Sequence, residues 1–169
     1  MVQLTELRRK HAEFAASLDG LRHTADEMES GSVLELWDRL TCAVGFLTHE
    51  LLPFTAVEDE ILYPALEVAA EASTPVDVLR AEHVTLAQMT AELDEARRAL
   101  PLGDNNGTWT NLRRILYGLY AVARLHFMVE DEIVLPLLES ELEGRDAEEL
   151  EAAIRAVAHN TTLSPAYEA

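Results

Sequence analysis

A tandem repeat constrains the fold of this chain more than any other feature of its sequence. The segment 57–67 (Val-Glu-Asp-Glu-Ile-Leu-Tyr-Pro-Ala-Leu-Glu) recurs 72 residues later at 129–139, with eight of its eleven positions identical. The same offset relates further pairs along the chain: Leu7 and Leu79, Arg8 and Arg80, His11 and His83, Leu40 and Leu112, and Leu47 and Leu119. A fixed offset of this kind indicates an old duplication, so the two halves are expected to fold alike about a pseudo-two-fold axis.

The repeat is broken at one chemically important position. The offset that pairs Glu58 with Glu130 also pairs Phe54 with His126. In the second half, His126 and Glu130 therefore stand four residues apart, whereas in the first half a phenylalanine precedes Glu58 by the same interval. Any site built from both halves is expected to be incomplete on the first side.

Length and composition favour a single cytoplasmic domain. The 169 residues suffice for one core and fit one domain, 1–169. With 13 basic against 31 acidic residues and a formal charge of -18, nucleic acid and anionic lipid are disfavoured as partners, while a neutral small ligand is compatible. The lone Cys42 cannot form an internal disulfide, and we find no run of 18 apolar residues and no apolar signal segment. We therefore expect no membrane partner.

Apolar periodicity and sparse glycine and proline predict an all-α protein. The expected helices span about 3–29, 32–70 with a disturbance at Pro53, 74–100 and 108–143, with a loop at 101–107 and Gly144 ending the fourth helix. Short connections between four long helices predict an antiparallel up-and-down four-helix bundle. A short fifth helix over about 146–159 and a loose tail are expected within 144–169, after a core at 5–143.

Two histidine- and glutamate-bearing half-sites follow from the repeat. Four residues on a helix advance about 6 Å and turn about 40°, so His126 and Glu130 present an imidazole and a carboxylate on one face. Two inward carboxylates, Glu58 and Glu130, repel each other across a bundle core unless a cation lies between them. The predicted metal ligands are His11, Glu58, His83, His126 and Glu130, and two iron ions would satisfy all of them.

These motifs resemble the hemerythrin-like HHE cation-binding domains. The resemblance rests on Arg9-Lys10-His11, on Glu58-Asp59-Glu60-Ile61-Leu62-Tyr63-Pro64, on Glu82-His83 and on His126-Phe127-Met128-Val129-Glu130, and it covers about residues 5–140. It implies a non-haem di-iron centre that binds or reacts with dioxygen, nitric oxide or peroxide, or senses oxygen or iron. Phe54 departs from the family pattern and depletes one half-site.

Several alternatives stay open from the sequence. A bulge at Pro53 could turn His49 inward as a replacement ligand, and Phe54 could line an apolar pocket of the size of a small gas. The bundle could instead have lost its metals and serve as a ligand-binding or interaction module. A third alternative is a mononuclear enzyme with His83, His126 and Glu130 as a 2-His-1-carboxylate set. Whether the protein is an enzyme is left open.

Overall fold

The structure, a computed structural model, describes residues 4–30, 32–70, 74–100, 106–142 and 144–162. All elements within these ranges are helical, and no strand occurs among them. The elements in chain order are α1 (Thr5–Asp26), α2 (Val33–Phe46), η1 (Leu47–Leu51), α3 (Leu52–Val57), η2 (Glu58–Leu62), α4 (Tyr63–Ala70), α5 (Thr74–Ala99), α6 (Asn106–Val129), η4 (Glu130–Val134), α7 (Leu135–Glu141) and α8 (Gly144–Thr162).

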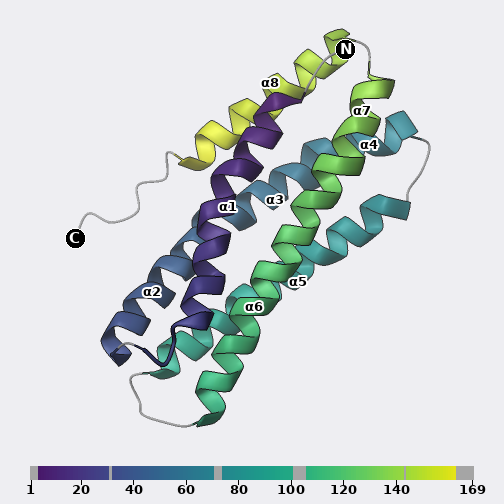
Figure 1. Ribbon diagram of the computed structural model, residues 1–169. Coiled ribbons are helices and arrows are strands. Elements are labelled where there is room, and N and C mark those ends of the chain that lie inside the picture. Colours follow the sequence, from purple (N-terminus) through teal and green to yellow (C-terminus); the bar gives the residue numbers. More distant parts are fainter. Residues whose placement is uncertain (1–3, 31, 71–73, 101–105, 143, 163–169) are drawn as a thin grey trace.

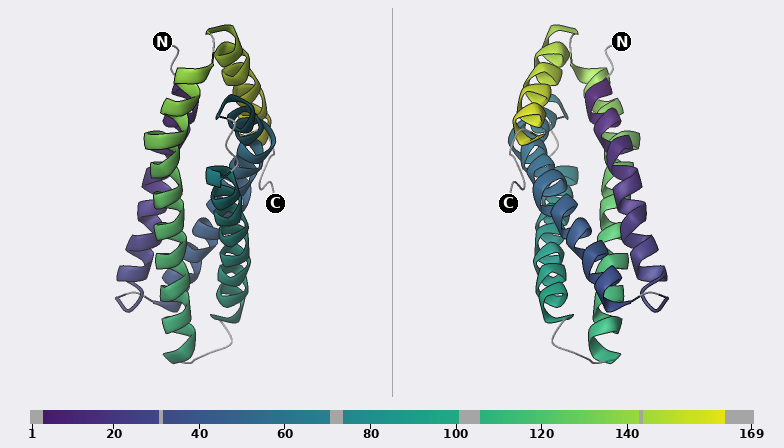
Figure 2. Two further views of the ribbon diagram at one scale, coloured as in Figure 1. Left: turned by 90° about the vertical axis from the view of Figure 1, so that its right-hand side faces the viewer. Right: turned by 90° about the vertical axis from the view of Figure 1, so that its left-hand side faces the viewer.

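These elements join into four long helical segments that run alternately up and down (Figure 1). Segment α2–α4 and segment α6–α7 each continue through π-helical turns without a break. Helix α1 packs beside α6 and α2, and α5 packs beside α6 and α2, which closes the bundle (Figure 2). Helix α8 lies across one end of it, against α1 and α3. The predicted helical-bundle fold is confirmed.

Local signals explain where several helices begin and end. Ser32 accepts from the backbone N–H of Glu35, whose side chain accepts from the Ser32 backbone N–H, which forms a capping box at the start of α2. Leu142 adopts an extended backbone that ends α7. Gly144 therefore begins α8 and does not end the preceding helix as expected, and α8 reaches Thr162, beyond the predicted end. The expected loop at 101–107 and the tail beyond Thr162 fall largely outside the described residues.

Two π-helical turns begin at the predicted glutamate ligands. Segments η2 and η4 start at Glu58 and Glu130, and so they stand at the offset of the repeat. A π turn inserts one extra residue into the helix and re-aims its side chains, and such turns are frequent at functional sites. A third π turn, η1, precedes Pro53, which lacks a backbone N–H, so the predicted disturbance near Pro53 is confirmed.

The core is a continuous set of buried leucines contributed by all four long segments. Examples are Leu7, Leu18, Leu21, Leu40, Leu47, Leu66, Leu79, Leu86, Leu112, Leu116, Leu119 and Leu138. Ion pairs at the surface follow the pseudo-symmetry: Arg8 bridges to Glu139, and its equivalent Arg80 bridges to Glu67. Each pair joins one half of the chain to the other at equivalent places, as an internal two-fold axis requires.

By length and composition, Val33–Ala69 could cross a membrane, with a mean hydropathy of 1.4 over its most apolar window. This is weak evidence, because the core helix of a bundle passes the same test. Segment α2–α4 packs within the bundle against α1, α5 and α8. It also carries Glu58, which is buried among the other helices.

Candidate metal centre

Five titratable side chains meet in the middle of the bundle. His11 comes from α1, Glu58 from η2, His83 from α5, His126 from α6 and Glu130 from η4. None is more than 5% exposed. Each long segment therefore supplies at least one member. The structure brings together all five residues that the sequence predicts as metal ligands, and we call them the His/Glu cluster.

The carboxylate of Glu58 lies at the centre of the His/Glu cluster. Its Oε1 is 3.5 Å from His11 Nε2, and its Oε2 is 3.4 Å from His83 Nε2 and 3.8 Å from His126 Nε2. Glu130 Oε2 lies 3.3 Å from His11 Nε2 and 3.6 Å from His126 Nε2. All three imidazoles thus present Nε2 to the same small space that the two carboxylates enter.

The outward nitrogens of the three histidines face carboxylates. Nδ1 of His11 is 2.8 Å from Asp131, and Nδ1 of His126 is 2.9 Å from Glu82. Nδ1 of His83 is 3.1 Å from Asp59, which is the equivalent of Asp131 in the repeat. A carboxylate at Nδ1 favours the tautomer that leaves the Nε2 lone pair free, which is the arrangement that ligating histidines have in metal sites.

Four of the inward atoms have no hydrogen-bond partner, whereas Nε2 of His83 and Nε2 of His126 lie 3.0 Å from each other. His11 Nε2, both oxygens of Glu58 and Glu130 Oε2 are buried and unpartnered. Only two further buried side-chain atoms in the described part of the chain lack a hydrogen-bond partner. They are Oδ1 of Asp59 and Nδ1 of His83, and both belong to the same site. Because an unpartnered buried polar atom is costly, this concentration calls for a cation among the inward atoms.

The ligand atoms form two overlapping groups of suitable size. Glu58, His83 and His126 make one group, and His11, Glu58 and Glu130 make the other, with the atoms of each group all within 4.8 Å of one another. Glu58 belongs to both groups. Imidazole and carboxylate ligands without sulfur suit first-row metals such as iron, manganese or zinc. The residues therefore fit a centre of one or two metal ions.

The electrostatics of the two carboxylates differ. Burial acts to raise the pKa of Glu58, but contacts with His11, His126 and His83 outweigh it and hold that pKa well below its ordinary value. Burial and the charge of Glu58 raise the pKa of Glu130 well above its ordinary value. Two buried carboxylates that cannot both ionise comfortably are a setting that a bound cation relieves.

Tyr63, which the sequence did not single out as a ligand, is part of this site. It is fully buried, and its hydroxyl donates to Glu130 Oε1 at 2.9 Å and lies 3.2 Å from His83 Nε2. Burial and the charge of Glu130 raise its pKa. Its position five residues after Glu58, one helical turn along, was the signal in the sequence. The π turn η2 between them brings the ring into the core.

Neither Phe54 nor His49 contributes a ligand atom to the His/Glu cluster. Phe54 is buried in contact with the rings of Phe14 and His11, at centroid distances of 5.3 and 5.8 Å. Phe127 stacks on His11 at 4.4 Å and completes an aromatic cluster on that side. His49 is exposed on η1, so the π turn beside Pro53 does not bring this candidate replacement ligand to the His/Glu cluster.

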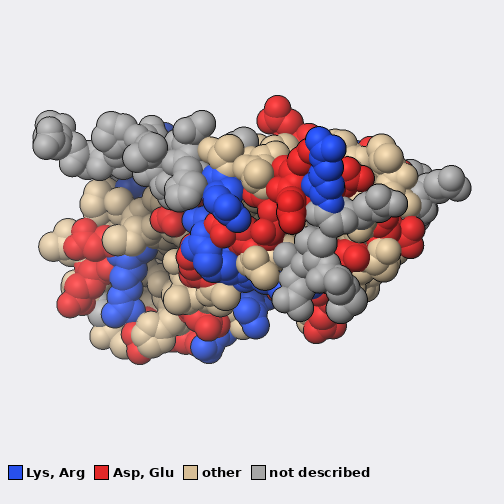
Figure 3. Space-filling view, turned by 90° about the horizontal axis from the view of Figure 1, so that it is seen from above, with Lys and Arg blue, Asp and Glu red and all other residues tan. Residues whose placement is uncertain are grey.

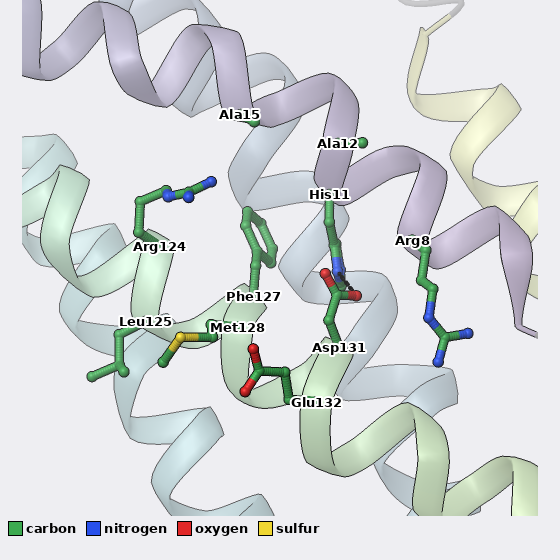
Figure 4. A pocket seen from close by; sticks show the side chains of 10 residues that line it. All are labelled: Arg8, His11, Ala12, Ala15, Arg124, Leu125, Phe127, Met128, Asp131 and Glu132. Atoms are coloured by element: carbon green, nitrogen blue, oxygen red, sulfur yellow. Dashed lines mark hydrogen bonds and ion pairs between the residues drawn. The ribbon is translucent and has the colours of Figure 1, made fainter.

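A surface pocket of about 480 Å³ opens over the outer side of His11 (Figure 4). Its lining comes from α1, α6 and η4: Arg8, His11, Ala12, Ala15, Arg124, Leu125, Phe127, Met128, Asp131 and Glu132. Figure 4 shows His11 and Asp131 pointing toward each other at the centre of this lining. Phe54 does not line this pocket. Leu125, Phe127 and Met128, which neighbour His126 along the chain, do line it.

Comparison with known proteins gives a family. The model of the hemerythrin HHE cation-binding domain matches residues 2–138 and, a second time, residues 74–161. The second match begins 72 residues after the first, at the offset of the internal repeat. No curated protein and no solved structure gave a significant match. The helical bundle, the buried His/Glu cluster and this match together show that the chain belongs to the hemerythrin HHE cation-binding family.

Proposed function

We propose that this protein is a non-haem iron protein that binds or reacts with a small diatomic molecule or peroxide, or senses iron or oxygen. The observation that supports the proposal is the set of inward, unpartnered atoms on His11, Glu58 and Glu130. His83, His126 and Glu58 would hold one iron, and His11 with the two carboxylates would hold a second. Bound iron supplies redox chemistry and an open coordination position for the small ligand.

The chain itself provides the setting for that chemistry. Buried leucines and the aromatic cluster around His11 surround the His/Glu cluster with apolar side chains. The Tyr63 hydroxyl holds Glu130, and the carboxylates of Asp131, Asp59 and Glu82 hold the imidazoles in one orientation. The pocket over His11 supports access from solvent on that side of the bundle.

A mononuclear site is the second candidate. His83, His126 and Glu58 form a 2-His-1-carboxylate group, with Glu58 in place of the Glu130 expected from the sequence. A metal-free module is the third. Metal analysis of protein purified without chelators separates them, because we expect about two irons per chain for a di-iron centre, against one or none for the alternatives. As a control, His23→Ala removes an exposed histidine and should leave the metal content unchanged.

We also propose a cytoplasmic protein without nucleic-acid or membrane partners. The formal charge of -18 supports this, because phosphate groups are repelled by such a surface. The face in Figure 3 carries acidic side chains interspersed with basic ones. Cell fractionation with an antibody would test the location, and recovery in the membrane fraction would contradict it.

A further inference from the structure

The two halves of the His/Glu cluster have different surroundings, and the differences all fall on the same side. The offset of the repeat places Phe54 where the second half has His126, and it places Lys10 where the second half has Glu82. It also places Leu135 where the first half has Tyr63. In space, His126, Glu82 and Tyr63 thus belong to the site of His83, and the equivalent positions on the His11 side carry Phe54, Lys10 and Leu135.

Glu82 and Tyr63 contact the two histidines of the second half, His126 and His83. Glu82 accepts from Nδ1 of His126 at 2.9 Å, and the Tyr63 hydroxyl lies 3.2 Å from Nε2 of His83. On the opposite side, Lys10 Nζ lies 5.7 Å from the ring centroid of Phe14, which packs edge-on against Phe54. Lys10 is only 15% exposed and pairs with Glu13. The lysine is therefore held against the aromatic cluster.

From these contacts we infer that the protein binds its two metal ions unequally, tightly at His83, His126 and Glu58 and weakly at His11, and that Lys10 and Phe54 together set the weak side. This inference rests on the proposed function and adds which position fills first. The half-site of His11 lacks both the imidazole that Phe54 replaces and the carboxylate that Lys10 replaces. The absence of either group would leave this half-site unable to hold a metal tightly.

The chemistry of position 10 explains why the lysine matters. A carboxylate at Nδ1 accepts a hydrogen bond from the Nδ1–H of the imidazole and leaves the Nε2 lone pair for a metal. An ammonium group has only donors, so an imidazole beside Lys10 would accept at Nδ1 and carry its own proton on Nε2. Replacing Phe54 by histidine would then aim a proton, not a lone pair, into the cluster. A carboxylate at position 10 is needed as well.

An anaerobic titration of the full chain with ferrous iron, in which calorimetry measures the heat of binding, tests the inference. For the parent we expect one tight position and a second at least ~10-fold weaker. Phe54→His alone should improve the second position little, whereas Phe54→His with Lys10→Glu should tighten it by a further ~10- to 100-fold. Lys10→Glu alone, without the new imidazole, is the matched control and should resemble the parent.

The reciprocal change tests the same idea from the tight side. Glu82→Lys should weaken the first position by ~10- to 100-fold, and Glu82→Gln, which keeps an acceptor, should weaken it less. Circular dichroism checks that each variant is folded, and Glu82→Gln carries the test if Glu82→Lys is not. Two equally tight positions in the parent, or full restoration by Phe54→His alone, would overturn the inference while leaving the proposed function intact. Absence of any metal binding by the parent would contradict the proposed function itself.

Discussion

At the scale of single residues, Glu130 and His126 are expected to respond differently to substitution. In the metal-free protein the raised pKa of Glu130 favours the neutral acid, and glutamine mimics that form while keeping the oxygen that accepts from Tyr63. Glu130→Gln should therefore lose metal yet leave the free energy of unfolding of the metal-free protein nearly unchanged.

His126→Ala should lose metal and stability together. The substitution leaves a cavity in a fully buried place and removes the partner of Glu82, so we expect a loss of about 1–3 kcal/mol in the metal-free protein. Urea unfolding with metal analysis measures both quantities for both variants. His49→Ala, which removes an exposed histidine, is the control. Parent-like metal content in both His126→Ala and Glu130→Gln would refute the ligand assignment.

Tyr63 offers a second test at this scale. Tyr63→Phe removes the hydroxyl that binds Glu130 but keeps the ring that stacks on His83 at 5.4 Å. Because Glu130 then loses its orienting partner, we expect metal affinity to fall ~10-fold and the unfolding free energy to fall by about 1 kcal/mol. Tyr117→Phe removes a surface hydroxyl bound to Asp26 and serves as control. Equal metal affinity in parent and Tyr63→Phe would show that the hydroxyl does not position Glu130.

At the scale of elements, two equivalent ion pairs, Arg8–Glu139 and Arg80–Glu67, join the two halves of the chain and are expected to differ in strength. Glu139 accepts from Arg8 and from the backbone N–H of Leu4 and is 11% exposed, whereas Glu67, bound to Arg80, is 38% exposed. Solvent therefore screens the ion pair of Glu67 more than that of Glu139. Glu139→Gln should cost about 1 kcal/mol at neutral pH, and Glu67→Gln should cost less than about 0.5 kcal/mol.

The cost of Glu139→Gln should depend on pH. The hydrogen bond from Arg8 lowers the pKa of Glu139 from its ordinary 4.5. A carboxylate with a lowered folded pKa contributes stability above the unfolded pKa and loses it as the pH falls through the folded value. The difference between parent and Glu139→Gln should therefore be full at neutral pH and shrink below about pH 4.5. Urea unfolding across this range measures it, and a difference that grows toward acid would contradict the assignment.

At the scale of the whole molecule, metal should stabilise the fold because all four long segments contribute to the His/Glu cluster. Ferrous iron at 100 times its dissociation constant adds about 2.7 kcal/mol. For a chain of this length that corresponds to a rise in Tm of roughly 5–10 °C. Anaerobic calorimetry with and without iron measures the shift. The variant Glu130→Gln should show little of it, and an unchanged Tm in the parent would argue against a metal held between the helices.

The sequence alone determined the helical bundle, the duplication and the five members of the His/Glu cluster. Amphipathic periodicity assigns a face to each residue within one helix, and the repeat then supplies the relation between helices that periodicity lacks. His11, a lone histidine in a charged stretch, could be assigned because the offset leads to His83. The helix bounds were predicted to within a few residues, apart from the region around Gly144.

Only the tertiary structure decided which side chains complete the site. The partners of the three histidines, Asp131, Asp59 and Glu82, lie on other helices, so their contacts depend on how the helices are rotated and spaced in the bundle. The π turns change that rotation by one residue, which periodicity does not register. In the bundle that results, Tyr63 enters the core while His49 stays at the surface.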